Sequence, residues 1–427
     1  MKTLPIHPSD LLSGNDTQGL HVEHVALESV ANEFGTPCYV YSQSAIEASW
    51  NDFTSHLAPL SPMVCFAVKA NPNLAILNLL ARLGSGFDIV SGGELARVIA
   101  AGGSPSKTVF SGVGKSVSEI EFALHSGVFC FNVESEAELD RIHSVAGRLG
   151  TKAPISLRVN PDVNAHTHPY IATGLKESKF GVAWENAVML YEHASRMSNL
   201  SIQGVDCHIG SQITELSPFG EALDRLLNLV EQLKEKGIPI EHIDVGGGIG
   251  ICYRDEIAPL MADYAKILID RLKGRSEHLL LEPGRRIIGN AGLLLTRVEY
   301  TKTAGDKRFA LVDAAMNDLM RPALYEAWHE VRAVKKQGGE QVFDIAGPVC
   351  ESGDILARDR LLEVHEGSLL AILSAGAYGS SMSSNYNTRP RPAEVLIQGT
   401  RAMLIRNRET LSTLWKDEII PAHSASI

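Results

Sequence analysis

The segment VCFAVKANP, residues 64–72, is an apolar run typical of a β-strand, and it brings Lys69 to its carboxyl end before Asn71 and Pro72 break the strand. Strands of this composition are buried on both faces in parallel sheets. A buried ammonium is costly unless its pKa falls or the amine becomes neutral, as it does in a Schiff base. The alternative is an ordinary lysine that extends from a strand end into water. The segment therefore predicts a buried parallel strand with Lys69 as a candidate reacting group.

Size and charge limit the possible functions. The chain has 427 residues, too many for one typical core, which indicates two domains or a barrel with a second domain. Its 44% hydrophobic and 21% charged residues are typical of a globular protein. The net charge is −11 and no basic run is longer than Lys335-Lys336, which argues against binding to nucleic acid or to an anionic membrane. A small-molecule partner is favoured.

Cysteine usage and the amino terminus predict a cytoplasmic protein. The opening residues MKTLPIHP lack the apolar core of a signal peptide, and no apolar stretch approaches the roughly 20 residues of a membrane span. The six cysteines are scattered without a C-x-x-C pair, as expected for reduced thiols rather than a disulfide framework or a zinc site. We expect no bound metal.

Short apolar runs alternate with longer helical patterns between about residues 37 and 285. The strand candidates are residues 63–68, 86–90, 108–111, 128–133, 155–159, 202–208, 242–245 and 278–281. Apolar residues recur every three or four positions in residues 74–83, 92–101, 118–125, 135–149, 184–196, 219–236 and 258–272. Strand-then-helix repeats of this number predict an α/β fold, a parallel (β/α)₈ barrel of the TIM type.

A doubly wound sheet is the alternative fold. Such a sheet would carry the dinucleotide motif G-x-G-x-x-G after a strand. The run GGGIG at residues 246–250 has Ile251 and Tyr253 where the two possible registers require the last glycine. The sequence therefore favours the barrel.

The pattern changes after about residue 290, where short β-type runs are separated by turns. They occupy residues 292–300, 308–313, 341–345, 369–372 and 394–397. We expect residues 286–427 to form a mostly β domain, a sandwich or barrel, and residues 37–285 to form the (β/α)₈ barrel. Residues 1–36, with a strand candidate at 22–26, are too few for their own core and are expected to pack on the β domain.

Polar residues and glycines follow or end several of the predicted strands, where a parallel barrel places its reacting groups. They are Lys69, Asp88, Arg158, His208, Ser211, Gly246, Gly247, Gly248, Glu282, Gly284 and Arg285. Each has a structural alternative: Asp88 with Arg158 as an ion pair, His208 as a core histidine, the glycines as a tight turn. Their shared position on one rim predicts an active site.

This set of side chains suits pyridoxal phosphate. A glycine-rich turn after a late strand offers backbone N–H groups to a phosphate. Lys69 can form the Schiff base, Glu282 can face the pyridine nitrogen and His208 can stack on the ring.

Five blocks of sequence carry a resemblance to a known family. FAVKAN (66–71), GFDIVSGGEL (86–95), HIGSQ (208–212), DVGGG (244–248) and EPGR (282–285) together resemble the alanine-racemase-like, fold-type III pyridoxal-phosphate enzymes. Within these the chain is similar to the decarboxylases of basic amino acids, which join a barrel to a β domain. The resemblance implies that Lys69 binds the cofactor, His208 stacks on it and Glu282 meets its nitrogen. It also implies that the residues about the phosphate and ring include Asp88, Arg158, Ser211, Gly247, Gly248, Gly284, Arg285 and Tyr378.

Four blocks of the second domain narrow the substrate. RPALY (321–325), CESGD (350–354), AGAY (375–378) and YNTRPRP (386–392) resemble the diaminopimelate decarboxylase family. That family converts meso-2,6-diaminopimelate to L-lysine and carbon dioxide, the last step of lysine biosynthesis.

The resemblance also implies roles for the residues of these blocks. Arg285, Arg321 and Tyr325 would bind the distal carboxylate of the substrate, and Glu351 its distal ammonium, as charge complementarity also suggests. Tyr378 would contact both substrate and cofactor. Cys350 is the expected proton donor and Lys69 the alternative. The expected assembly is a homodimer in which Cys350 and Glu351 reach the partner's site.

Three other functions are possible. A decarboxylase of ornithine, arginine or carboxynorspermidine would share the fold, but ornithine decarboxylases carry aspartate at the position of Glu351 and lack the RPALY block. A non-catalytic binding relative would have no need for Lys69. A cofactor-free aldolase would leave the glycine turn without a purpose. Residues 160–179, with HTHP at 166–169, are expected to form a loop over the site rather than a metal centre.

Overall fold

The computed structural model describes residues 7–15, 19–164, 179–336 and 339–421. The chain forms two compact units. Unit 1 contains the described residues of Met1–Leu11, Gln43–Gly292 and Gly376–Ser381, and unit 2 those of Leu12–Ser42, Leu293–Ala375 and Met382–Ile427. None of the described helices is long and apolar enough to cross a membrane.

Unit 1 is built on a closed barrel of parallel strands. In order around the barrel they are β5 (Met63–Ala67), β6 (Gly86–Ile89), β7 (Thr108–Phe110), β8 (Cys130–Val133), β9 (Ala153–Asn160), β11 (Leu200–Asp206), β12 (His242–Asp244) and β13 (His278–Leu281). Pairing of β13 with β5 closes the ring, and β10 (Val182–Ala183) adds a short parallel pairing to β9. The eight predicted strands are thus confirmed to within two residues, and the barrel fold with them.

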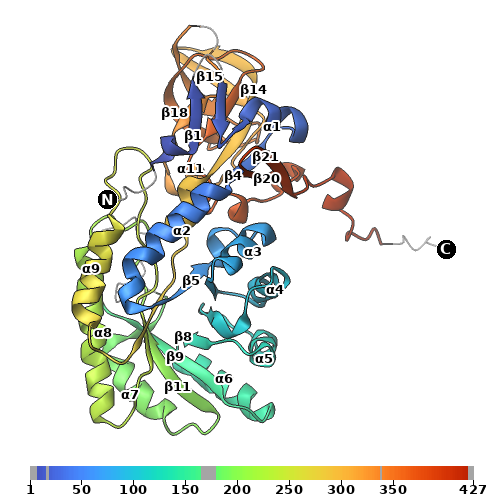
Figure 1. Ribbon diagram of the computed structural model, residues 1–427. Coiled ribbons are helices and arrows are strands. Elements are labelled where there is room, and N and C mark those ends of the chain that lie inside the picture. The colour runs from blue at the N-terminus through green and yellow to red at the C-terminus, as the bar shows by residue number, and fades with distance from the viewer. Residues whose placement is uncertain (1–6, 16–18, 165–178, 337–338, 422–427) are drawn as a thin grey trace, which may run out of the picture. The chain divides into compact units, whose positions relative to one another are not determined.

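Helices surround these strands (Figure 1). They are α2 (Gln43–Leu57), α3 (Leu74–Arg82), α4 (Gly92–Ala100), α5 (Val117–Ser126), α6 (Glu136–Arg148), α7 (Trp184–Ala194), α8 (Ser217–Glu235), α9 (Met261–Leu272) and the short α10 (Arg285–Ile288). Short polar residues begin several of them: Asn73, Ser91, Ser116 and Ser135 each accept a hydrogen bond from a backbone N–H of the first turn. Such caps satisfy N–H groups that have no partner within the helix. They end each strand-to-helix loop at a defined residue.

Register brings polar side chains together at the carboxyl ends of the strands. Ala67 of β5 is opposite Asp88 of β6. Asp206 of β11 is opposite both Arg158 of β9 and Asp244 of β12. Because parallel strands end on the same rim, these groups occupy one layer of the barrel.

Unit 2 is a mostly β structure around one branched sheet. Along its main path the strands are β18 (Ile355–Leu362), β17 (Gln341–Ala346), β15 (Lys307–Val312), β14 (Gly292–Ala304), β4 (Cys38–Ser42), β20 (Ala393–Gln398) and β21 (Arg401–Arg406). Strand β19 (Leu369–Ile372) pairs with β14 and with β16 (Val331–Ala333), and one short helix, α11 (Arg321–Tyr325), follows β15. The β domain expected from the sequence is confirmed.

The amino-terminal segment contributes to unit 2. It contains β1 (Leu12–Asn15), β2 (Gly19–Val22), β3 (Val25–Ala26) and α1 (Leu27–Phe34). The N–H of Leu20 donates to the carbonyl of Val334 at 2.8 Å, and that of His24 to the carbonyl of Gly399 at 3.1 Å. These bonds attach the segment to unit 2.

Strand β4 places the boundary between the units later in the chain than the sequence predicted. The sequence led us to begin the barrel at residue 37, but β4 is fully buried in unit 2, parallel to β20. The Tyr41 hydroxyl donates to Glu394 at 2.7 Å. An isolated apolar run of five residues looks the same whichever sheet it joins, so the boundary after Ser42 is visible only in the strand pairing.

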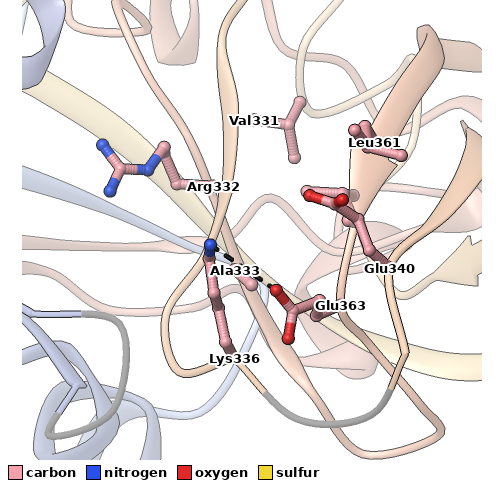
Figure 2. A pocket seen from close by; sticks show the side chains of 8 residues that line it. Val331, Arg332, Ala333, Lys336, Glu340, Leu361 and Glu363 are labelled. Atoms are coloured by element: carbon pink, nitrogen blue, oxygen red, sulfur yellow. Dashed lines mark ion pairs between the residues drawn. The ribbon is translucent and has the colours of Figure 1, made fainter.

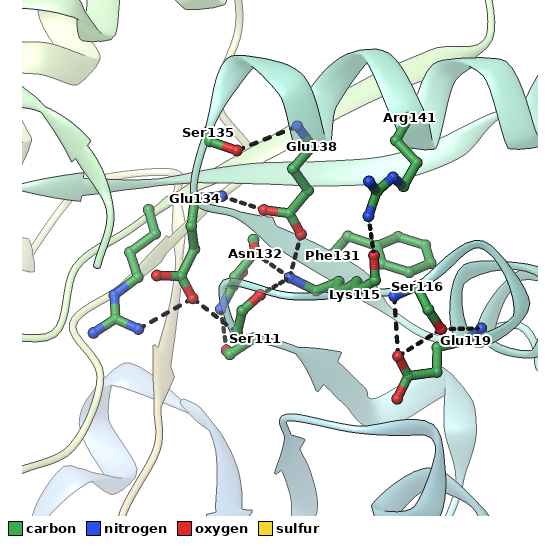
Figure 3. Close-up of polar contacts among 12 residues, drawn as sticks. Ser111, Lys115, Ser116, Glu119, Phe131, Asn132, Glu134, Ser135, Glu138 and Arg141 are labelled. Carbon is green, nitrogen blue, oxygen red and sulfur yellow. Dashed lines mark hydrogen bonds and ion pairs between the residues drawn. The ribbon is translucent and has the colours of Figure 1, made fainter. Parts of the chain in front are cut away.

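A buried lysine joins β7, β8 and α6 (Figure 3). The Lys115 side chain is fully buried, and its Nζ donates to the carbonyls of Gly112 and Asn132, both at 2.8 Å, and to Glu138 at 2.6 Å. The other oxygen of Glu138 accepts from the N–H of Glu134 at 2.7 Å. All three donor positions of the ammonium are therefore satisfied, which makes its burial tolerable.

Replacing Lys115 with methionine is expected to lower the free energy of unfolding by roughly 3–5 kcal/mol, because Glu138 would remain buried without its cation. Urea unfolding of purified protein measures this loss. The double variant Lys115→Met/Glu138→Gln, which removes the stranded charge, should recover part of it. Equal stability of the single variant and the wild type would contradict a structural role for the pair.

Candidate active site

Lys69 lies directly after β5 and is paired with a buried carboxylate. Its Nζ is 2.5 Å from Oδ2 of Asp88, whose side chain is fully buried while that of Lys69 is 38% exposed. Burial lowers the pKa of Lys69, but Asp88 and Glu282, with Tyr378, outweigh burial and raise it above its usual range. Without cofactor, Lys69 is therefore an ammonium held at the rim. The possibility that Asp88 pairs with Arg158 is wrong, since Asp88 binds Lys69.

Arg158 instead pairs with an acidic residue that the sequence analysis did not single out. Its Nη1 lies 3.4 Å from Oε1 of Glu134, and its guanidinium stacks on the ring of Phe180 at 5.0 Å. Glu134 also accepts the backbone N–H groups of Gly112 and Gly181, at 2.8 and 3.1 Å. Arg158 is thus fixed in the rim by a carboxylate that is itself anchored.

His208 follows β11 and contacts the glycine turn. Its Nδ1 accepts the backbone N–H of Gly247 at 3.1 Å, so the ring proton of the neutral form is on Nε2. Burial, together with the charges of Arg158 and Lys69, holds the pKa of His208 well below its usual range. The imidazole is therefore neutral and fixed in orientation.

The glycine turn after β12 has no room for side chains. A Cβ on Gly247 would lie 2.1 Å from the carbonyl oxygen of Glu282, and one on Gly248, whose φ is +108°, would lie 2.3 Å from that of Gly210. The N–H of Gly246 donates to Asp244 at 2.8 Å. Only glycine allows these close backbone approaches.

Arg285 joins three segments of unit 1. Its Nη2 donates to Ser211 Oγ at 3.0 Å and its Nη1 to the Tyr253 hydroxyl at 2.5 Å. Its guanidinium lies 4.8 Å from the ring of Tyr378, in the segment Gly376–Ser381 that belongs to unit 1. The Tyr378 N–H donates to the carbonyl of Ala70 at 2.9 Å, which ties this segment to the residue after Lys69.

Glu282 lies at the end of β13 with donors on one oxygen. Oε1 accepts from Ser111 Oγ at 3.4 Å and from Asn132 Nδ2 at 3.3 Å. Asp206, Asp244 and Glu282 each have a carboxylate oxygen within 4.8 Å of the other two. All three are buried, so their charges repel one another in a medium that screens little.

This crowding raises the affinity of the three carboxyls for protons. Burial raises the pKa of Glu282 well above its usual range, and Asp244, Asp88 and Asp206 raise it further. Burial also raises the pKa of Asp244, to about 7, and the charge of Asp88 contributes to this rise. The end of β13 therefore favours a cation or a proton beside Glu282.

In unit 2, Arg321 is buried and fixed by a histidine. Its Nη1 is 2.9 Å from Nε2 of His329, whose Nδ1 is 2.8 Å from the carbonyl of Leu373. The carbonyl can only accept, so Nδ1 of His329 carries the proton and Nε2 accepts from Arg321. Tyr325 ends the same helix, α11, and is half-buried.

Cys350 and Glu351 are exposed on a loop of unit 2 that is held from both sides. The N–H of Cys350 donates to Asn387 Oδ1 at 3.0 Å, and the Tyr386 hydroxyl donates to Glu351 Oε1 at 2.6 Å. Asp354 Oδ2 accepts the N–H of Val349 at 2.8 Å. Both candidate functional side chains thus project from a fixed backbone.

A cavity of about 270 Å³ in unit 2 is unrelated to these residues (Figure 2). Val331, Arg332, Lys336, Glu340, Leu361 and Glu363 are among its lining residues. Its cations face carboxylates, with Lys336 3.5 Å from Glu363 and Arg332 3.9 Å from Glu330. None of the predicted site residues lines it.

The structure adds residues to which the sequence analysis gave no role. Ser111, Asn132 and Asp206 surround Glu282, together with Asp244 of the DVGGG block. Each is a polar residue in or next to an apolar strand, which was the available signal, but a single polar residue in a strand does not show which neighbours it meets. The proposed loop with HTHP at 166–169 lies mostly outside the described residues.

Comparison with known proteins identifies the family. A model of the pyridoxal-binding domain of pyridoxal-dependent decarboxylases matches residues 43–289. The diaminopimelate decarboxylase of Pseudomonas aeruginosa is 57% identical over 410 residues, covering 96% of this chain and 99% of the relative. That of Vibrio cholerae is 56% identical over 403 residues, covering 94% and 97%. The chain belongs to the diaminopimelate decarboxylase family.

A solved structure of this family agrees with the fold. The diaminopimelate decarboxylase of M. jannaschii, in complex with L-lysine, superposes with a TM-score of 0.92 at 40% identity, covering 97% of this chain and 99% of that one. Diaminopimelate decarboxylases thus share both units of this chain, barrel and β domain.

Pyridoxal phosphate, the cofactor of the decarboxylase family, fits the residues present. The turn at Gly247 and Gly248 exposes backbone where a Cβ would clash, and Ser211 and Arg285 lie beside one another. Glu282 is a buried carboxyl in surroundings that favour a cation, which suits a protonated ring nitrogen. The cofactor prediction is confirmed by the family, and the roles of individual residues remain predictions.

Replacing Asp244 with asparagine is expected to flatten the pH dependence of stability of the cofactor-free protein. The pKa of Asp244 is about 7 when folded, against an ordinary value of 3.8. Between about pH 4 and 7 the unfolded chain releases a proton that the folded chain keeps. The free energy of unfolding of the wild type, relative to Asp244→Asn, should therefore fall across that range and then level off.

Urea unfolding at a series of pH values from 4.5 to 8 would measure this difference, with the pH step chosen as about half a unit. Asp255→Asn is the control, because its side chain is 83% exposed. A stability difference between wild type and Asp244→Asn that does not change with pH would contradict the raised pKa.

Proposed function

We propose that this protein catalyses the pyridoxal-phosphate-dependent decarboxylation of meso-2,6-diaminopimelate to L-lysine and carbon dioxide. The observation that carries the proposal is the pairing of Lys69 with Asp88 at 2.5 Å on the rim of a pyridoxal-binding barrel. Such a pair keeps the amine of Lys69 in place until it meets the cofactor. The names of the relatives supply the substrate.

The residues of unit 1 would hold the cofactor. Lys69 is the proposed attachment residue, and the backbone at Gly247 and Gly248, with Ser211 and Arg285, would surround its phosphate. His208 would pack on the ring and Glu282 would accept a hydrogen bond from the ring nitrogen. Pyridoxal phosphate, when bound, supplies an electron sink for the pair released as the Cα–carboxylate bond breaks.

Unit 2 would recognise the end of the substrate that does not react. Arg321, whose Nη1 lies 2.9 Å from Nε2 of His329, would donate to the distal carboxylate, as would Tyr325 and Arg285. Glu351 would accept the distal ammonium. A substrate with both groups at its far end suits this set, whereas ornithine has only the amine.

A proton must reach the carbon that loses its carboxylate. Cys350 is the proposed donor and Lys69 the alternative. Asn387 fixes the backbone of Cys350, and Tyr386 fixes the carboxylate of Glu351, so the thiol and the carboxylate are presented at a constant spacing.

We further propose a cytoplasmic homodimer that binds no nucleic acid. None of the six cysteines, all of them in the described residues, forms a disulfide, as expected in a reducing compartment, and the net charge of −11 opposes binding to phosphate backbones. Exposure of Cys350 and Glu351 on unit 2 is consistent with their use in a partner's site.

Carbon dioxide release tests the proposed function directly. The purified protein, with pyridoxal phosphate added, is assayed with meso-diaminopimelate, L-ornithine, L-arginine and carboxynorspermidine in parallel. We expect release from meso-diaminopimelate alone, with L-lysine formed in equal amount. Release mainly from another amino acid would overturn the substrate, and release from none would overturn the activity.

Arg321→Gln is expected to raise the KM for meso-diaminopimelate by about tenfold to a hundredfold, the range for a lost hydrogen bond to a charged group. The value of kcat should change less, because Arg321 contacts the end of the substrate away from the reacting bond. Steady-state kinetics separate the two constants. Arg332→Gln, in the cavity of unit 2, is the control and should leave both unchanged.

Mixing two inactive variants tests whether sites are shared. If Lys69 and Cys350 act in one site from different subunits, then Lys69→Ala and Cys350→Ala subunits, unfolded together and refolded, form hybrid dimers with one intact site. About a quarter of wild-type activity should return, by random pairing of two-site dimers. Recovery of no activity would favour sites within single subunits.

A further inference from the structure

Two buried polar residues of unit 1 have no part in the roles assigned above. Ser111 follows β7 and Asn132 lies in β8, with exposed fractions of 4% and 0%. The Ser111 hydroxyl and the Asn132 amide both donate to Oε1 of Glu282, at 3.4 and 3.3 Å. Two donors on one oxygen mark it as an acceptor, so Oε1 does not carry a proton.

The side-chain amide of Asn132 bonds only to Ser111 and Glu282 among the described residues. Its Nδ2 donates to Ser111 Oγ at 3.1 Å as well as to Glu282, while its Oδ1 has no hydrogen-bond donor there. A buried amide oxygen without a donor costs stability. The hydrogen bond that Nδ2 donates to Glu282 therefore explains an asparagine here better than a gain in the stability of the barrel does.

The backbone of Asn132 is held in place from the other side. Lys115 donates to its carbonyl at 2.8 Å and is fixed by Glu138 at 2.6 Å (Figure 3). The same Nζ binds the carbonyl of Gly112, the residue after Ser111. One buried ammonium thus sets the spacing between the two donors that meet Glu282.

The charges around Glu282 explain why donors are needed there. Four other carboxylates lie at the same end of the barrel: Asp88, Glu134, Asp206 and Asp244. Two cations, Lys69 and Arg158, lie among them. Each cation already contacts a carboxylate: Lys69 pairs with Asp88 at 2.5 Å, and Arg158 with Glu134 at 3.4 Å.

No buried thiol adds a further negative charge. Burial raises the pKa of Cys65, Cys130 and Cys207 well above the usual range, so all three stay neutral. The groups left around Glu282 without a contacting cation are Asp206 and Asp244, which favour a protonated Glu282.

We propose that Ser111 and Asn132 are positioning residues that hold Glu282 as an anion, with Oε2 left free to bind a protonated ring nitrogen. The inference rests on the proposed function, in which Glu282 meets that nitrogen. The two donors on Oε1 offset the repulsion from Asp206 and Asp244 when Glu282 is ionised.

Loss of the donors should act on the cofactor rather than on the substrate. Without them the anion of Glu282 is less stable, and the ring nitrogen loses its proton at lower pH. A ring without that proton is a weaker electron sink, so kcat falls. The residues proposed to bind the distal end of the substrate do not include Ser111 or Asn132, so the KM for substrate should stay within about twofold, well below the effect of a lost charged hydrogen bond.

Asn132→Leu and Ser111→Ala test the proposal in protein reconstituted with pyridoxal phosphate. Fluorescence titration gives the Kd of the cofactor, nitrogen NMR of pyridoxal phosphate isotope-labelled at the ring nitrogen follows the protonation of that nitrogen between pH 6 and 10 in steps of about half a unit, and kinetics give kcat and KM. For Asn132→Leu we expect a Kd about tenfold higher, a kcat about tenfold lower and a ring-nitrogen transition at lower pH. Ser111→Ala should shift each in the same direction by less.

Asn290→Leu is the matched control, a buried asparagine of unit 1 whose amide donates to the carbonyl of Cys252 at 3.3 Å. It should lower thermal stability without moving the ring-nitrogen transition. Should Asn132→Leu and Ser111→Ala keep the wild-type transition and kcat at saturating cofactor, the proposal is overturned, whatever their stability. Wild-type protein that binds cofactor but releases no carbon dioxide would instead overturn the proposed function, while the Kd and NMR comparisons would still decide this inference.

Discussion

Closure of the parallel barrel is the constraint on which the site in unit 1 depends. Pairing of β13 with β5 and of β8 with β9 joins the eight strands in a ring, and because the strands are parallel their carboxyl ends share one rim. Residues far apart in the chain, Lys69 and Glu282 among them, become neighbours only through this closure. The glycine turn after β12 then approaches the end of β13 so closely that a single Cβ would clash.

Charge is the second constraint, because the rim is buried and rich in acids. Lys69 and Arg158 each pair with one carboxylate. Burial and mutual repulsion favour a proton or a nearby cation at Asp206, Asp244 and Glu282. A site of this kind is prepared for a cofactor that brings a positive ring nitrogen. The buried ammonium of Lys115 has a structural role. It donates hydrogen bonds to two backbone carbonyls and to Glu138, and so fixes the ends of β7 and β8 relative to each other.

In unit 2, hydrogen bonds hold the candidate functional side chains at fixed positions. Arg321 is oriented by His329, whose own tautomer is set by a backbone carbonyl. Cys350 and Glu351 are held by Asn387 and Tyr386, four residues that two sequence blocks bring together. Side chains on loops gain precision from such contacts, which a motif of loop residues alone does not show.

The sequence by itself determined the barrel, the β domain and the family, because strand and helix periods are local and because motifs such as FAVKAN and EPGR are contiguous. It also placed Lys69, His208 and Glu282 on one rim, since parallel strands share the direction of their carboxyl ends. Only the tertiary structure decided that Asp88 pairs with Lys69 rather than with Arg158, and that β4 belongs to unit 2. Those choices depend on register and on distances between segments remote in the chain, and no local pattern encodes them.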